Sequence, residues 1–273
     1  KVIYVKKGVY KEKLILPSWL TNITICGEDR DNTIITWDDH ANIKMPTGGL
    51  DSEAAVKGKP MGTFRTYTLK VQGSYITLKN ITIENNAAKL GQAVSLHLEG
   101  NHILVQNCRL LGNQDTVYTG IANNRSAFYD CYIEGTTDFI FGPGRAWFEN
   151  CEIRSKANSY ITAASSPAGQ EYGYVFNKCK LTAEPGIDKV YLGRPWRPYA
   201  ATLFMNCEMG SHIRPEGWHN WGKHSNEQTA RYSEYNNHGS GAATKARVAW
   251  SRQLTKKEAA KVTIKNVFGE EAW

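Results

Sequence analysis

The chain has 273 residues, with 33 Lys and Arg against 26 Asp and Glu, so its formal net charge is +7. Hydrophobic residues make up 41% and charged residues 22%, a globular composition that excludes collagen-like, coiled-coil and wholly disordered chains. The longest apolar runs are only a few residues, too short for a membrane-spanning helix, and no signal peptide is visible. We expect a single domain over residues 1–273 with a sizeable core.

The excess of positive charge favours an anionic partner, such as nucleic acid, anionic lipid or an acidic polysaccharide. A solvated surface with a mild excess of charge explains it equally well, because the basic residues are spread along the chain. The eight Trp and 14 Tyr residues are many for this length. Aromatic rings pack in cores, and they also line clefts that bind sugars.

The two ends of the chain carry different patterns. Residues 1–5 read as a β-strand, whereas residues 37–62 are the longest stretch without a strand pattern and predict a surface excursion. Towards the other end, residues 225–241 are polar and rich in Gly and Asn. Residues 254–262 then predict a short helix with Thr255 as its N-cap, which we expect to pack on or cap the domain.

Between these ends one short pattern recurs: alternating apolar residues, a polar residue, then Cys or Ile, then more alternation. Alternation with a period of two marks half-buried strands, and no amphipathic helix intervenes, which disfavours βαβ and TIM-barrel folds. Successive copies are 27, 23, 20, 28 and 28 residues apart, measured at Ile81, Cys108, Cys131, Cys151, Cys179 and Cys207. Repeats of this size, made of short strands and turns, predict a parallel β-solenoid with stacked coils.

Five of the six cysteines occupy the same place in successive copies, so in a solenoid they would form an inward ladder of small hydrophobic side chains. A disulfide framework or a metal cluster is the alternative, disfavoured because the sequence has no C-x-x-C pair and can form a large core. Four copies carry an Asn just before the marker, at Asn80, Asn107, Asn150 and Asn206. Asn tolerates a left-handed backbone and suits a tight bend between strands.

The sequence lacks the G-x-S-x-G, H-E-x-x-H, P-loop and G-x-G-x-x-G motifs, and its seven His residues are scattered. Two acidic residues are more informative, because Asp115 lies seven residues after Cys108 and Asp138 lies seven residues after Cys131. Equivalent positions in adjacent coils stack roughly 5 Å apart, so the predicted solenoid places these two carboxylates side by side. Repulsion at that distance raises one pKa, so one group can stay protonated while the other is ionised.

Two loop aspartates that bond backbone amides would give the same pattern without any catalysis. The apolar run of residues 139–141 weakens that alternative, because a carboxylate beside it needs a specific partner. The residues alone leave both interpretations open.

Five stretches, taken in order, resemble the pectin methylesterase family of aspartyl esterases: Gly8-Val-Tyr-Lys-Glu12, Gln92-Ala-Val-Ser-Leu96, Gln114-Asp-Thr-Val-Tyr118, Asp138-Phe-Ile-Phe-Gly142 and Leu192-Gly-Arg-Pro-Trp196. Residues 217–221 and 247–268 also resemble the C-terminal part of that family, so the resemblance covers nearly the whole chain. It implies a right-handed parallel β-helix, in agreement with the repeats. The expected fold class is all-β, a single-stranded right-handed parallel β-helix with a short C-terminal helix.

The resemblance also implies roles for matching positions. Asp138 would be the nucleophile that attacks a galacturonate methyl ester, and Asp115 would be the acid that releases methanol and then activates water. Gln114 and Gln92 would stabilise the oxyanion, and Arg194 would pair with the nucleophile. The implied substrate-binding residues are Trp196, Thr68, Tyr118, Phe139 and Trp221, although core packing explains each aromatic ring about equally well.

The implied reaction is hydrolysis of the methyl esters of polygalacturonate to pectate and methanol, with no metal and no cofactor. We expect methyl-esterified polygalacturonate as the partner, no nucleic acid and no membrane, a monomer, and a secreted or periplasmic location. Two alternatives remain. A β-helix pectate lyase would need a calcium-binding acidic cluster and a basic proton acceptor, and a non-catalytic solenoid would only bind acidic polysaccharide.

The chain departs from the family pattern at two points. Ser95 stands where many relatives have Ala. The family's usual opening segment, an Asp-Gly-rich strand and a helix over the first coil, is absent from the sequence. If that segment is missing from the protein, we expect an exposed N-terminal edge and reduced stability; if it lies outside this sequence or was removed, nothing follows for catalysis.

Overall fold

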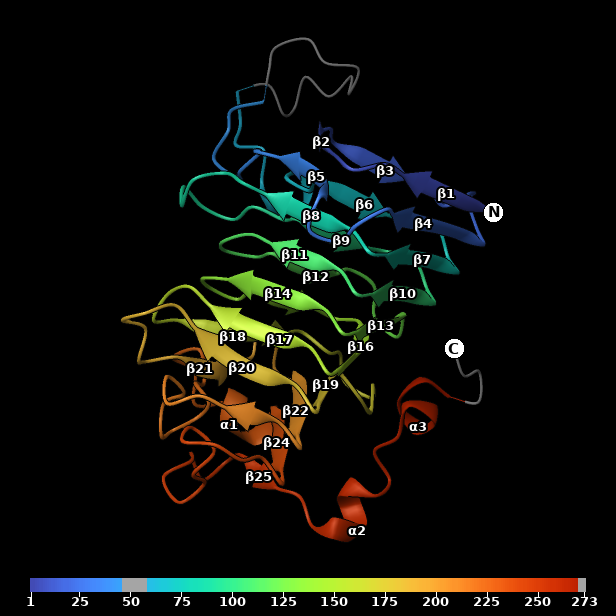
Figure 1. The fold of residues 1–273 in the computed structure, drawn as a ribbon. Coiled ribbons are helices and arrows are strands. Elements are labelled where there is room, and N and C mark those ends of the chain that lie inside the picture. Colours follow the sequence, from blue (N-terminus) through green and yellow to red (C-terminus); the bar gives the residue numbers. More distant parts are fainter. Residues whose placement is uncertain (46–57, 270–273) are drawn as a thin grey trace.

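The computed structural model of the protein describes residues 1–45 and 58–269. In these residues three parallel sheets run side by side along a solenoid, whose coils stack from the N-terminal to the C-terminal end (Figure 1). A complete coil adds one strand to each sheet in turn, as β10 (Ile103–Gln106), β11 (Arg109–Leu111) and β12 (Val117–Thr119) do. This arrangement confirms the predicted all-β parallel β-helix.

Each sheet takes its strands in order along the solenoid axis. The first sheet has β1 (Val2–Val5), β4 (Ile23–Gly27), β7 (Ile76–Lys79), β10, β13 (Arg125–Tyr129), β16 (Arg145–Glu149), β19 (Tyr174–Asn177), β22 (Ala201–Met205), β24 (Arg231–Tyr235) and β25 (Arg252–Gln253). The second has β2 (Gly8–Lys11), β5 (Thr33–Trp37), β8 (Thr82–Asn85), β11, β14 (Tyr132–Gly135), β17 (Glu152–Ser155), β20 (Lys180–Ala183) and β23 (Glu208–Met209). The third has β3 (Leu14–Leu16), β6 (Leu69–Val71), β9 (Leu96–Leu98), β12, β15 (Ile140–Gly142), β18 (Tyr160–Ala164) and β21 (Tyr191–Gly193).

The helices of the described residues are all short. They are the 3₁₀ turn η1 (Thr63–Arg65), α1 (Asn226–Thr229), α2 (Lys256–Ala259) and α3 (Ile264–Phe268). None of them is long and apolar enough to cross a membrane. Nearly half of the expected surface excursion at residues 37–62 lies outside the described residues, since positions 46–57 are not described.

The core of the solenoid repeats from coil to coil because the strands keep their register. Four buried rings, one each from β13, β16, β19 and β22, stack nearly parallel with centroids 4.5, 4.3 and 4.3 Å apart: Phe128, Phe148, Phe176 and Phe204. Stacks of this kind gain dispersion energy beyond the area that they bury. The core that results is one continuous column along the solenoid.

The predicted cysteine ladder is confirmed. The five repeating cysteines are buried and free, and the Sγ of Cys151 lies 3.5 Å from the carbonyl oxygen of Phe128 in the preceding coil. The same type of contact recurs at the other four, which are Cys108, Cys131, Cys179 and Cys207. The sixth, Cys26, is half-buried in β4 and stands outside the ladder.

The predicted Asn bends are confirmed as well. Asn80, Asn107, Asn150 and Asn206 have left-handed φ angles of 52°, 49°, 54° and 54°. Asp130 and Lys178 fill the same bend in the remaining coils, with φ angles of 54° and 52°. Side chains also bond along the ladder of bends, because the Asn107 amide donates to Asn80 Oδ1 at 2.9 Å.

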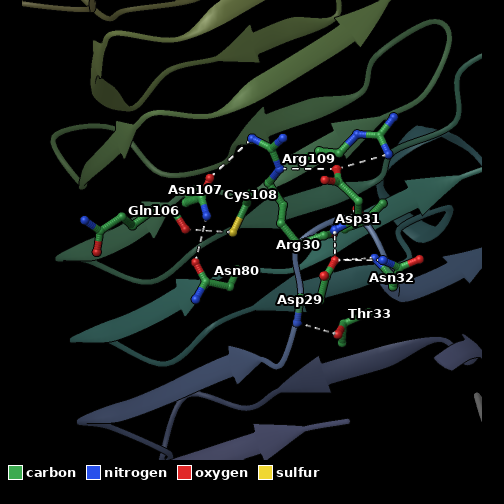
Figure 2. A network of polar contacts seen from close by, with 11 residues as sticks. Asp29, Arg30, Asp31, Asn32, Thr33, Asn80, Gln106, Asn107, Cys108 and Arg109 are labelled. Carbon is green, nitrogen blue, oxygen red and sulfur yellow. Dashed lines mark hydrogen bonds and ion pairs between the residues drawn. The ribbon is translucent and has the colours of Figure 1, made fainter. Parts of the chain in front are cut away.

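A network of polar contacts links the first coils of the solenoid (Figure 2). In the turn between β4 and β5, Asp29 Oδ1 accepts hydrogen bonds from the backbone N–H groups of Asp31 and Asn32. From this turn Arg30 donates to Asn107 Oδ1 at 3.3 Å, and Asp31 pairs with Arg109 at 3.6 Å. These contacts reach two coils further along the solenoid.

The two ends of the described solenoid differ. At the first edge of the described residues, β1, β2 and β3 carry apolar side chains that are exposed, with Tyr4 76% and Val9 70% exposed. At the other end α2 begins with a capping box between Thr255 and Glu258, which confirms the predicted N-cap. The helix ends four residues later, well before residue 262, and α3 then packs on the first sheet through Val267 and Phe268.

Candidate active site

Asp115 and Asp138 occupy equivalent places in adjacent coils. Each lies two residues before a strand of the third sheet, and those strands, β12 and β15, pair in the register Val117↔Ile140. The Asp115 N–H donates to the carbonyl of Thr137 at 3.1 Å, which joins the two turns directly. The equal spacing in the sequence therefore predicted their placement correctly.

Arg194 lies just after β21 and holds one of the two acids. Its Nε donates to Asp138 Oδ1 at 2.9 Å and its Nη2 to Asp138 Oδ2 at 2.7 Å, a two-pronged ion pair. Its guanidinium carbon lies 4.0 Å from the ring centroid of Tyr160 and 3.7 Å from that of Trp221. Within the described residues, the Asp115 carboxyl group has no such hydrogen-bond partner.

The two acids have different protonation behaviour, although both are buried, with 7% and 5% of Asp115 and Asp138 exposed. Burial raises the pKa of Asp115 well above its usual range, and the charge of Asp138 raises it further, against a smaller opposing effect of Arg194. Burial also raises the pKa of Asp138, but the hydrogen bonds and charge of Arg194 lower it. Of the two acids, Asp138 is therefore the easier to ionise.

The pair opens into a cleft of about 320 Å³. Besides the two acids and Arg194, the side chains around it include Gln92, Gln114, Phe64, Phe141, Trp196 and Trp221. The backbone N–H of Ala93 donates to the Gln114 carbonyl at 3.0 Å, so the two glutamines come from adjacent coils. Their side-chain amides make no hydrogen bond to a described residue and remain available to a ligand.

Three of the residues implied to bind substrate are placed differently. Thr68 is fully buried, and its hydroxyl donates to the Glu84 carbonyl at 2.7 Å, so it does not reach the cleft. Phe139 is fully buried in the main core, so the alternative of core packing holds for it. Tyr118 is half-buried beside the cleft, where it packs on Phe141 with ring centroids 4.7 Å apart.

Three aromatic residues near the acids were not anticipated: Phe64, Phe141 and Tyr160. Phe141 stands three residues after Asp138, as Tyr118 stands three after Asp115, so the equal-offset rule that found the acids would have selected it over Phe139. Phe64 comes from η1, outside the repeats, and no spacing signal indicates it.

His97, one of the scattered histidines, is buried and bonds Glu99, and burial lowers its pKa to about 4.

The fold and the site together define a β-helix protein with a buried carboxylate pair in an open, aromatic-lined cleft. The Pectinesterase family model matches residues 1–271, and the chain belongs to that family.

Known proteins of the family resemble the chain over most of its length. The chain is 37% identical to Pectinesterase 31 of Arabidopsis thaliana, over 94% of this chain and 80% of that protein. It is 33% identical to the probable pectinesterase/pectinesterase inhibitor 64 of the same plant, but spans only 46% of that longer protein.

Solved structures show the same right-handed β-helix, which confirms the predicted handedness. Pectin methylesterase from Yersinia enterocolitica matches with a TM-score of 0.86 and 29% identity, over 100% of this chain and 95% of that one. Pectin methylesterase from carrot matches with a TM-score of 0.86 and 30% identity, over 98% of this chain and 83% of that one. A pectin methylesterase solved in complex with a hexasaccharide matches with a TM-score of 0.82 and 29% identity, over 99% and 89%.

Proposed function

We propose that the protein is a pectin methylesterase, which hydrolyses methyl esters of polygalacturonate to pectate and methanol. Membership of the pectinesterase family supports the reaction and the substrate. One observation carries the assignment of residues: Arg194 grips Asp138 through two hydrogen bonds, while Asp115 stands beside it with a raised pKa and no such partner. One acid is thus prepared as a nucleophile and the other as a proton donor.

In the first step an ionised oxygen of Asp138 attacks the carbonyl carbon of the ester. The carbonyl oxygen becomes an oxyanion, and the free side-chain amides of Gln92 and Gln114 donate hydrogen bonds to it. The positive charge of Arg194 keeps Asp138 ionised until the attack. Loss of one oxyanion donor of this kind typically costs about 10²- to 10³-fold in turnover.

In the second step the tetrahedral intermediate collapses. The bond to the methoxy oxygen breaks, Asp115 gives its proton to that oxygen, and methanol leaves. Asp138 is left as an acid anhydride with the galacturonate. Asp115, now ionised, takes one proton from water as the water oxygen attacks the galacturonate carbonyl carbon of the anhydride, which breaks the bond to Asp138 and frees it as a carboxylate. The galacturonic acid product loses its remaining proton to solvent, and the proton on Asp115 restores the starting state.

The aromatic cleft is suited to a sugar chain. The rings of Phe64, Trp196 and Trp221 lie along it and offer flat apolar faces against which pyranose rings can stack. The substrate is a polymer, and we expect its chain to pass over the acids along this cleft. A relative of similar fold was solved with a hexasaccharide bound, which agrees with an extended binding cleft.

The partner that we propose is methyl-esterified polygalacturonate, and we expect no binding to nucleic acid or to membranes. We propose that the protein is a monomer and that it is secreted or periplasmic. The substrate is a component of cell walls and lies outside cells, which supports this location. The net charge of +7 suits a polyanion whose charge increases as esters are removed. Because demethylated product carries more negative charge than substrate, we expect product binding to weaken as salt rises.

Methanol release from methylated polygalacturonate tests the proposal. Asp138→Asn should lower turnover on the order of 10³-fold or more, and Asp115→Asn by about 10²- to 10⁴-fold, both with the folded structure retained. Release of methanol that EDTA abolishes would favour a metal-dependent enzyme instead. Unsaturated products absorbing near-ultraviolet light would indicate a lyase, and pectin binding without any turnover would indicate a binding solenoid.

A further inference from the structure

The guanidinium of Arg194 lies between two aromatic rings. Its carbon is 4.0 Å from the centroid of Tyr160 and 3.7 Å from that of Trp221, both within the range of a cation–π contact. Trp221 borders the cleft, but Tyr160 is not among the residues that line it. Tyr160 therefore reaches the reacting groups through Arg194 and not through the substrate.

Tyr160 has a second link to the nucleophile. Its backbone carbonyl accepts the N–H of Asp138 at 2.8 Å, so the residue supports both members of the ion pair, one by its main chain and one by its ring. Within the described residues, its hydroxyl group has no hydrogen-bond partner. The ring face, and not the hydroxyl group, is thus the part that contacts the site.

The ring of Tyr160 is itself held in place. It stacks on Tyr191 with centroids 5.3 Å apart and an interplanar angle of 13°, and the imidazole of His219 packs against both rings. His219 Nδ1 accepts the backbone N–H of Trp221 at 3.0 Å. Trp221 has a left-handed φ of 62°, an unfavourable conformation for a bulky residue, so this contact helps to hold the opposite ring over the guanidinium.

We propose that Tyr160 is a positioning residue, whose ring clamps the Arg194 guanidinium against Trp221 so that both prongs stay on Asp138. An unclamped arginine side chain samples several rotamers, which reduces the time that its charge spends on the carboxylate. Without the clamp, Asp138 would bind protons more readily, and less of it would be the ionised nucleophile at mildly acidic pH. The proposal rests on the function assigned above to Asp138.

The test compares the pH dependence of kcat for Tyr160→Leu, Tyr160→Phe and the unmodified protein. Tyr160→Leu removes the ring, so the acidic limb of the profile should move to higher pH, and kcat below that limb should fall about two- to tenfold. KM should change little, because Tyr160 does not line the cleft. Tyr160→Phe keeps the ring and should behave as the unmodified protein does.

Two controls separate positioning from general damage. Tyr132→Leu removes another ring that faces an arginine, with Arg109 at 5.5 Å, but on the second sheet, and it should leave the pH profile unchanged. Replacement of residue 160 by phenylalanines with increasing fluorination keeps the shape of the ring and weakens its negative face. The acidic limb of the pH profile should move to higher pH with each added fluorine. This result does not depend on whether the leucine variant folds well.

A second readout does not depend on turnover. The ¹³C resonance of the Asp138 carboxyl group reports its protonation directly. The pH midpoint of its titration should be higher in Tyr160→Leu than in the unmodified protein, and it should be unchanged in Tyr160→Phe. The other titratable groups coupled to this pair are Asp115, Tyr232 and His219, and all remain in each variant. An unchanged Asp138 midpoint in Tyr160→Leu would overturn the clamp while leaving the esterase assignment intact. A shift as large in Tyr160→Phe would assign the effect to the hydroxyl group and would also overturn it.

Discussion

Arg194 holds both carboxylate oxygens of Asp138, at 2.9 and 2.7 Å, and so separates two acids that are otherwise alike. Both lie two residues before a strand of the third sheet, both are buried, and both have raised pKa values. The ion pair makes one of them the easier to ionise. Most of what we expect of the site in solution follows from that asymmetry.

The first prediction concerns the pH dependence of turnover. The reaction needs Asp138 ionised and Asp115 protonated, so kcat should rise with pH through the pKa of Asp138 and fall through the higher pKa of Asp115. In Arg194→Gln the arginine no longer lowers the pKa of Asp138. The rising limb of the profile should therefore move to higher pH, by about one to three units. Arg109→Gln, on the second sheet, is the control. A rising limb that stays in place in Arg194→Gln would contradict the assignment of Asp138.

The second prediction is that Asp115 destabilises the folded protein at neutral pH. In the unfolded chain Asp115 titrates near its ordinary pKa of about 3.9, whereas in the folded protein its pKa is well above that value. Folded stability therefore falls as pH rises from the lower of these values to the higher one. Asn cannot ionise, so Asp115→Asn should unfold at higher urea concentration than the unmodified protein at pH 7 and at about the same concentration at pH 3.

A matched control for this experiment is Asp130→Asn. Asp130 has the same left-handed backbone, with φ 54° against 67° for Asp115, but its side chain is exposed. Its replacement should change the urea midpoint little at either pH. Equal stabilisation by both variants would mean that the left-handed backbone shared by the two positions, and not burial of Asp115, is responsible.

The third prediction separates two phenylalanines. Phe64 is 45% exposed at the cleft, whereas Phe139 is fully buried in the core. Phe64→Ala should raise KM about two- to twelvefold with little loss of stability, because it removes a stacking surface. Phe139→Ala should instead lower the free energy of unfolding by about 3–5 kcal/mol. Kinetics and urea unfolding of both variants would decide, and a reversed pattern would refute the placement of the two rings.

The fourth prediction concerns thiol reactivity. Burial raises the pKa of Cys108, Cys131, Cys151 and Cys179 well above the ordinary value, and Cys207 is buried with them. Only the half-buried Cys26 should react with a thiol reagent in the native protein, and all six cysteines should react after denaturation without reductant. Cys26→Ser should abolish the native reaction. Fewer than six reactive thiols after denaturation would indicate a disulfide.

Much of the fold could be predicted because its strands and bends repeat along the sequence. Across the six bends a buried cysteine recurs five times and a left-handed Asn four times, and both follow from the local backbone and its packing. The first coils were harder to recognise because Cys26 lies in β4, outside the ladder. The C-terminal helix was predicted too long, because the apolar residues Leu254 and Val262 pack on the core from outside α2, which covers only Lys256–Ala259. Thr263 then caps a separate helix α3, with its Oγ1 accepting from the Asn266 N–H.

The candidate site could be predicted as far as it follows the repeat. Asp115, Asp138 and the two glutamines lie at equivalent turns of adjacent coils and were placed correctly. Phe139 was misplaced because the bend at Asp138 breaks the simple alternation of inward and outward residues, so that Phe139 and Ile140 are both in the core. Phe64 lies outside the repeat, on a loop whose position depends on the whole fold.

The backbone at the two acids has a consequence for how such a site can arise. Asp115 and Asp138 both have left-handed φ angles, of 67° and 51°, where Gly, Asn and Asp are favoured over other residues. A solenoid lengthens when a coil is duplicated, and the copy inherits both this backbone and its acid. Duplication of a coil would then place a second carboxylate beside the first, and the copied backbone would already have the left-handed conformation that the acid occupies. The repeated backbone of the coils therefore accounts for the two neighbouring acids, and Arg194 accounts for the difference between them.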